Sequence, residues 1–132
     1  MALAKYTIVP RGAYPFHRVD ALSRYAFGLI YDRFRLSNRE ETQHKWTDKH
    51  GVYCVFDRAD LARELGVSLP TLRRCMDVLV EQGLIVMRRN GPHAAWRYYP
   101  TARAHLYMEC SAADIANAIE SYRRSIHEDD VE

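Results

Sequence analysis

The sequence predicts an α+β fold, a winged helix-turn-helix with an N-terminal arm, an extra β-hairpin and a C-terminal helix. Residues 57–83 contain two helical segments, each with a capping residue at its start and a glycine at its end. A turn of about three residues joins them, and a hairpin with alternating apolar residues follows over 84–99. The order helix, turn, helix, hairpin is typical of a winged helix-turn-helix.

The N-terminal part divides into an arm and a first helix. Residues 1–19 are expected to form an arm that packs against the body, because Pro10, Gly12 and Pro15 interrupt regular structure. The winged-helix domain is expected over residues 20–110. It begins with a helix over 20–36, which Asp20 or Ser23 can cap and which carries a broad apolar face.

A short hairpin is expected after the polar loop that follows this helix. Trp46 is placed in its first strand, residues 48–51 in its turn and residues 52–56 in its second strand. Gly51 supplies the positive φ that such a turn usually needs.

The helix-turn-helix has clear start and stop signals. Asp57 caps its first helix, and Gly66 ends that helix. Ser68 caps its second helix, and Gly83 ends it. The wing is expected as strands over 84–89 and 95–99 around a turn at 90–93, with Pro100 as its end.

The last part of the chain is expected to be a helix over 111–126, capped by Ser111, and an acidic tail or start of a linker over 127–132. Isoleucine and tyrosine form a narrow apolar seam along this helix. The seam has two interpretations, packing on the body or contact with a second copy of the chain, and the sequence does not decide between them.

Charge is unevenly distributed. The whole chain has 19 Lys and Arg against 17 Asp and Glu, a net charge of +2. Residues 104–132 hold seven acidic and two basic residues, so residues 1–103 hold the other 17 basic and 10 acidic residues, a balance of +7. A basic body permits a polyanionic partner such as nucleic acid.

Several classes of protein do not fit the sequence. It has no apolar run long enough to span a membrane, and its N-terminus is unlike a secretory signal. Glycine-rich phosphate loops and local catalytic signatures are absent, so we expect neither an enzyme nor a cofactor. His44 and His50 are not expected to bind metal, and the three cysteines are expected to be free thiols in a reducing cytoplasm.

The candidate site follows from the positions that the apolar stripe of the second helix leaves free. Leu72, Met76 and Leu79 are expected to hold this helix on the first one. The N-terminal half of such a helix enters the major groove of DNA, and a basic wing tip reaches phosphates or the adjacent minor groove. The predicted DNA-binding residues are Ser68, Leu69, Thr71, Arg73, Arg74 and Asp77 on the helix and Arg88, Arg89, His93 and Arg97 on the wing.

Two other interpretations of these arginines remain open. They could be a solvated helix face that Glu64, Asp77 and Glu81 neutralise, and winged helices also serve as protein-interaction modules. We favour DNA binding because both elements carry basic residues, and all seven cations of residues 57–99 are arginine, which suits bidentate contacts to guanine.

Three further strings carry a resemblance to a known family. They are AFGLIYDRFRLS, KWTDKHGVYCVF and DLARELGVSLPTLRRCMDVLVEQGLI, followed by a basic hairpin that ends in WRYY. Over residues 5–100 the sequence resembles the N-terminal DNA-binding domain of the RepA_N plasmid replication initiators.

The resemblance implies binding to double-stranded DNA at origin repeats of a plasmid or mobile element, usually by a homodimer. It places Thr71, Arg73 and Arg74 of the helix and Arg88, Arg89 and Arg97 of the wing at the DNA. It also implies a C-terminal domain that engages host replication proteins, which this chain is too short to contain; we expect a truncated or stand-alone form. A transcriptional repressor is the alternative with the same physical activity.

Overall fold

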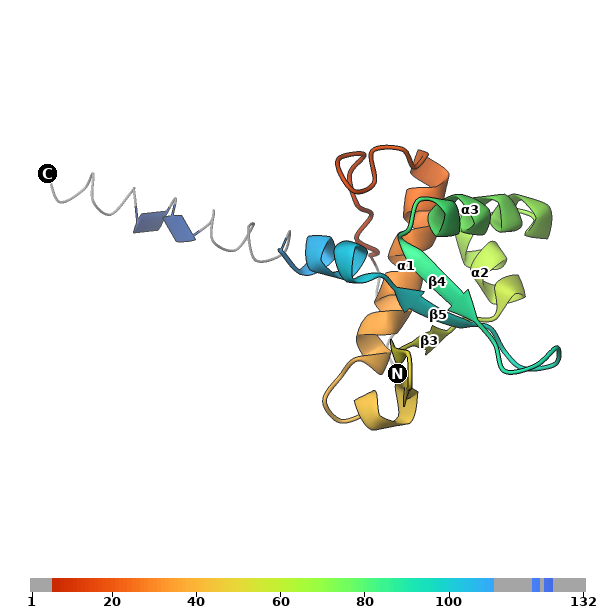
Figure 1. Cartoon of the computed structure of the whole chain (residues 1–132). Coiled ribbons are helices and arrows are strands. Elements are labelled where there is room, and N and C mark those ends of the chain that lie inside the picture. The colour runs from red at the N-terminus through yellow and green to blue at the C-terminus, as the bar shows by residue number, and fades with distance from the viewer. Residues whose placement is uncertain (1–5, 111–119, 122, 125–132) are drawn as a thin grey trace, which may run out of the picture.

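The computed structural model describes residues 6–110, 120–121 and 123–124. It confirms the α+β winged helix-turn-helix. Helix α1 (Ala21–Ser37) lies at the centre and contacts α2 (Arg58–Leu65), α3 (Leu69–Glu81) and two strands of a small sheet (Figure 1). Its inner face, with Phe27, Ile30 and Tyr31, is buried among the apolar side chains of these elements.

The sheet that forms the wing has three antiparallel strands. Their order is β3 (Cys54–Val55), β5 (Arg97–Pro100) and β4 (Ile85–Arg88). Tyr98 lies in the middle strand, fully buried, with Cys54 and Met87 opposite it on its two neighbours. Residues 89–96 between β4 and β5 form the wing loop, which is longer than the turn predicted over 90–93.

The helix-turn-helix has the predicted caps. Asp57 Oδ1 accepts a hydrogen bond from the Asp60 N–H at 3.1 Å, and Ser68 Oγ accepts one from the Thr71 N–H at 3.4 Å. Gly66 ends α2 with φ of +79°, a left-handed conformation that costs a residue with a Cβ free energy. These local signals fix where both helices begin and where the chain turns between them.

The arm is tied to α1 by polar contacts. Thr7 donates a hydrogen bond from its hydroxyl to Asp32 at 2.8 Å, and Arg24 donates one to the Pro10 carbonyl at 3.1 Å. Asp20 caps α1 and accepts hydrogen bonds from the N–H and the hydroxyl of Ser23.

The extra hairpin differs from the prediction. Trp46 lies in a 3-10 helix, η1 (Gln43–Trp46), and the hairpin consists of β1 (Thr47–Asp48) and β2 (Gly51–Val52). The expected second strand divides at Tyr53, because Cys54 and Val55 pair with β5 of the wing. The reason is burial: the Cys54 side chain is fully buried in the main core, which draws this half of the strand into the larger sheet.

Residues 102–110 form a helix that the sequence pattern did not indicate. Thr101 starts it, since its hydroxyl accepts a hydrogen bond from the Ala104 N–H at 3.4 Å. Tyr31 of α1 donates a hydrogen bond to Glu109 of this helix at 2.6 Å, and burial together with that contact raises the pKa of Tyr31. The predicted cap at Ser111, nearly all of the helix expected over 111–126 and the tail over 127–132 lie outside the described residues.

None of the helices in the described part of the chain combines the length and the hydropathy of a membrane-spanning helix. Among the same residues, no three His, Cys, Asp or Glu side chains are grouped so that they could hold a metal ion. Cys54 and Cys75 are buried free thiols, and Cys110 is an exposed one.

Candidate nucleic-acid interface

The N-terminal half of α3 presents a polar face to solvent. Leu72 and Met76 are buried against the body, as predicted, while Leu69 is 54% exposed. Ser68 and Thr71, at the start of this helix, are linked through their hydroxyls at 3.1 Å. Such a helix start attracts a phosphate oxygen.

Arg73 extends from this face into solvent. It forms no ion pair with any residue that the structure describes. Together with Arg58 and Leu69 it lines a shallow hollow of about 180 Å³ between α2 and α3. Asp77 follows one turn later and is exposed as well. Arg73 is therefore a free guanidinium at the position from which a recognition helix contacts bases.

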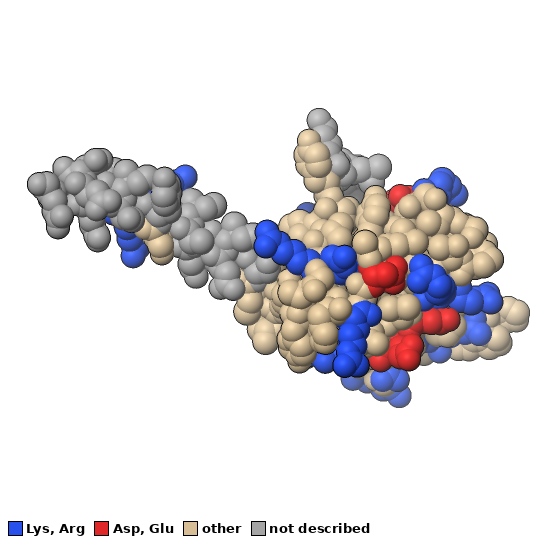
Figure 2. Space-filling model, turned by 90° about the horizontal axis from the view of Figure 1, so that it is seen from above, with Lys and Arg blue, Asp and Glu red and all other residues tan. Residues whose placement is uncertain are grey.

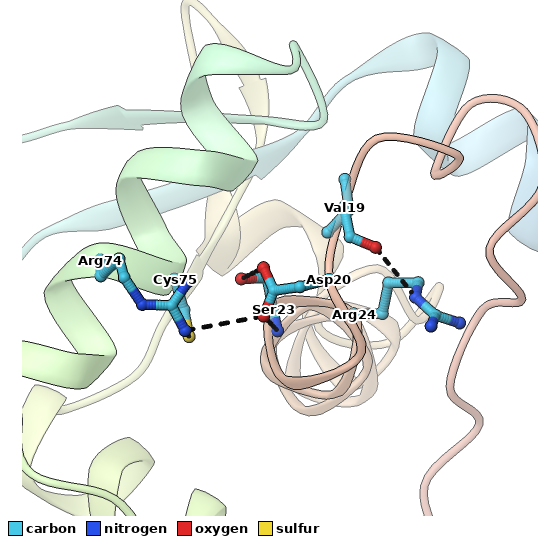
Figure 3. A network of polar contacts seen from close by, with 6 residues as sticks. All are labelled: Val19, Asp20, Ser23, Arg24, Arg74 and Cys75. Atoms are coloured by element: carbon cyan, nitrogen blue, oxygen red, sulfur yellow. Dashed lines mark hydrogen bonds and ion pairs between the residues drawn. The ribbon is translucent and has the colours of Figure 1, made fainter.

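Arg74 points in a different direction. Its Nη2 lies 3.6 Å from Oδ2 of Asp20, the residue that caps α1, and 3.9 Å from the sulfur of Cys75 (Figure 3). Burial raises the pKa of Asp20, but the hydrogen bonds from Ser23 and the charge of Arg74 outweigh it, so the pKa is lowered. In this geometry Arg74 holds α3 on α1, whereas the sequence predicted a DNA contact for it.

The end of β4 and the wing loop carry three exposed basic residues, Arg88 in the strand and Arg89 and His93 in the loop. Arg89 lies over the ring of Trp96, 4.5 Å from its centroid, and donates a hydrogen bond to the Pro92 carbonyl at 3.3 Å. The guanidinium of Arg58, at the start of α2, lies 5.3 Å from the same Trp96 ring. Trp96 thus makes cation–π contacts with an arginine of the wing and with one of the helix-turn-helix, which connects the two.

The sequence predicted that the Arg97 side chain faces DNA, but in the structure this side chain contacts the extra hairpin. It is half-buried, its Nη1 donates to Asp48 of the extra hairpin at 2.7 Å, and its Cζ lies 4.4 Å from the centroid of the Tyr53 ring. In the sheet it is directly opposite Arg88, so two guanidinium groups share one face. The carboxylate of Asp48 neutralises one of them, which turns Arg97 toward the hairpin.

The two elements that carry the predicted site, α3 and the wing, project at one end of the molecule (Figure 1). In Figure 1 the start of α3 and the wing loop both project toward the right, away from the end of the described chain. Seen from the side on which α3 lies, Lys and Arg gather around this end with Asp and Glu between them (Figure 2). The surface is therefore mixed in charge, with unpaired arginines at its two projecting elements.

The structure places two basic residues of the extra hairpin beside the wing that were not among the predicted site residues. Lys49 and His50 lie across a groove from Arg88 and Arg89. The sequence placed them in a turn, and no local pattern shows that the turn lies beside the wing. The feature that places the turn beside the wing is the Asp48–Arg97 pair, which joins residues 49 positions apart in the sequence.

Comparisons with known proteins agree with this geometry. Residues 58–86 match the family of winged helix-turn-helix DNA-binding domains. No curated protein matches the sequence.

Several solved structures are similar in fold, and three of them illustrate the likeness. One is described as the N-terminal domain of a DNA-binding protein and one as a Rep–DNA complex; each has a TM-score of 0.57 and 20% identity, over 83% of this chain and 88% of that one. The third, described as an MDR initiator, has a TM-score of 0.55 and 18% identity, over 82% and 89% of the two chains. At this identity the likeness concerns the fold. Together with the match over residues 58–86, it shows that the chain carries a winged helix-turn-helix of the DNA-binding type.

Proposed function

We propose that this protein binds double-stranded DNA sequence-specifically, as a replication initiator of a plasmid or mobile element that recognises origin repeats. The observation that carries the DNA-binding part is the exposed Arg73, which forms no ion pair among the described residues. It belongs to α3, whose start projects to the same side as the wing loop (Figure 1), and the exposed Arg88 and Arg89 lie where β4 meets this loop. The initiator part is supported by the likeness of the fold to a Rep–DNA complex and an MDR initiator and by the resemblance of residues 5–100 to the RepA_N family.

In this proposal α3 enters the major groove with its N-terminal half. Arg73 contacts guanine O6 and N7, the exposed Leu69 side chain is placed for apolar contact with a thymine methyl, and the start of the helix receives a phosphate. The wing places Arg88 and Arg89 on the backbone of the adjacent minor groove. A homodimer would present two such helices about 34 Å apart, one turn of DNA.

A transcriptional repressor would use the same surface, and the two roles differ in where the bound sequences lie. The test is selection of bound duplexes from a random pool. If the protein is an initiator, we expect the enriched motif to recur as tandem copies near the gene that encodes the protein. A single copy at a promoter supports the repressor, and the absence of any enriched motif contradicts sequence-specific binding.

A protein-interaction module is the candidate from another class. It needs no phosphate contacts, so its binding to duplex DNA would be absent or independent of salt concentration. Contact with host replication proteins is part of the initiator proposal and would be tested by co-purification of such proteins with this chain.

A further inference from the structure

An open groove of about 690 Å³ separates the extra hairpin from the wing. Asp48, Lys49 and His50 form the hairpin wall, and Arg88, Arg89 and Trp96 are among the residues of the wing wall. The groove lies outside the residues predicted for DNA binding on α3. Arg88 and Arg89 border it and also form the wing surface, so the two surfaces are continuous.

The groove is strongly basic. Four of its lining residues are cationic at neutral pH, namely Lys49, Arg88, Arg89 and Arg97, and Asp48 is the one acidic residue among those that line it. Lys49, Arg88 and Arg89 form no ion pair within the described part of the chain, so their charges face the groove uncompensated.

Among these charges Asp48 pairs only with Arg97, because hydrogen bonds from its own neighbours occupy both of its oxygens. Oδ2 accepts hydrogen bonds from Arg97 at 2.7 Å and from the Tyr99 hydroxyl, and Oδ1 accepts one from the His50 N–H at 2.7 Å. Burial raises the pKa of Asp48, but the hydrogen bonds from Tyr99, the His50 N–H and Arg97 outweigh it and lower the pKa to about 2. The carboxylate is a fixed structural anion.

The same contacts hold the two walls together. Arg97 belongs to β5 of the wing and Asp48 to β1 of the hairpin, and the His50 and Tyr99 rings pack at 6.1 Å between centroids. Lys49 is thereby set at a fixed place relative to the wing. A basic groove whose walls are already in place loses little conformational entropy when a polyanion enters it.

We propose that this groove holds one sugar-phosphate strand of the DNA, next to the segment that the wing contacts. The inference rests on the proposed DNA binding and extends it with a third contact element, the hairpin turn at Lys49. An open basic channel suits a regular chain of phosphates, with Lys49 as a point charge on one wall and the guanidinium forks of Arg88 and Arg89 on the other. Contacts of this kind position the protein and carry no sequence information.

The test uses Lys49→Ala, with Lys45→Ala as the matched control. Lys45 is an exposed lysine four residues earlier, in η1, and does not line the groove. The probe is a fluorescent duplex of about 30 base pairs and mixed sequence, titrated by anisotropy at several salt concentrations. Loss of one phosphate contact reduces the slope of log affinity against log salt by about 0.9.

We expect Lys49→Ala to reduce the slope by about 0.9 and to weaken binding about fivefold to tenfold at 0.1 M salt. Lys49→Arg should keep the wild-type slope, and Lys45→Ala should leave both quantities unchanged. If Lys49→Ala keeps the wild-type slope and affinity, or if the Lys45→Ala control changes them equally, the proposal that the groove holds a DNA strand is wrong, and the proposed function is unaffected. If the wild-type protein binds no duplex, the proposed function fails instead.

Discussion

The arginines of the helix and the wing divide into two groups that the sequence does not distinguish. Arg73, Arg88 and Arg89 are exposed and form no ion pair among the described residues. Arg74 and Arg97 each contact an aspartate from a distant part of the chain. Adjacent residues on a helix point about 100° apart, so Arg73 faces outward while Arg74 reaches α1. The first group is available to a ligand, and the second holds the elements that present it.

The largest expected effect concerns Arg73. Arg73→Ala should weaken binding to the selected DNA site by about 1–3 kcal/mol and relax the preference at one base pair, because a bidentate contact to guanine is lost. Its unfolding midpoint should stay at the wild-type value, since no folded-state partner is lost.

Arg73→Lys sharpens this test. Lysine keeps the positive charge but cannot make the bidentate contact of a guanidinium. Arg73→Lys should therefore bind more tightly than Arg73→Ala but without the wild-type base preference. If Arg73→Ala weakens binding equally on every sequence, Arg73 contacts phosphates and not bases.

The wing should act through phosphates. The double variant Arg88→Ala, Arg89→Ala should weaken binding to all duplexes alike and reduce the salt slope by about 1.8, which corresponds to two contacts. The measurement is the same salt titration on two unrelated sequences. A loss confined to one sequence would mean that the wing reads bases or groove shape.

The ion pair between Asp48 and Arg97 should stabilise the folded protein. The pKa of Asp48 is about 2 in the folded protein, below its ordinary value of 3.8, so its stabilising contribution is present above about pH 4 and is lost as the pH falls through 2. Asp48→Asn should lower the thermal midpoint at pH 7 and flatten its fall between pH 4 and pH 2. Circular dichroism melts across that range check both, and an unchanged pH profile would contradict the pair.

These two residues also show what the sequence could and could not predict. Caps and turn glycines act within a few residues, so Asp57, Gly66 and Ser68 indicated the helix-turn-helix correctly. The Asp48–Arg97 pair joins residues 49 positions apart, and the division of the expected strand at Tyr53 depends on the pairing of β3 with the distant β5. Both contacts form only when the chain folds. The helix over 102–110 has one threonine cap and no strong stop signal, so it was missed.

The smallest effect is expected for Arg74. Its ion pair with Asp20 is about half exposed, with side-chain exposures of 53% and 43%, and exposed pairs of this kind contribute about 0–1 kcal/mol to stability. Arg74→Ala should lower the free energy of unfolding by no more than about this amount, as chemical denaturation would measure. It should change DNA affinity no more than about twofold, about 0.4 kcal/mol. A loss of affinity as large as that of Arg73→Ala would show that Arg74 leaves Asp20 to contact DNA.

The most direct test of a duplex-binding surface built from unpaired arginines is the salt dependence of wild-type binding. If each subunit neutralises about four to six phosphates, the slope of log affinity against log salt is expected between about −3.6 and −5.4. A slope near zero would show that these cations do not neutralise phosphates, and it would contradict the assignment of Arg73, Arg88 and Arg89 to DNA.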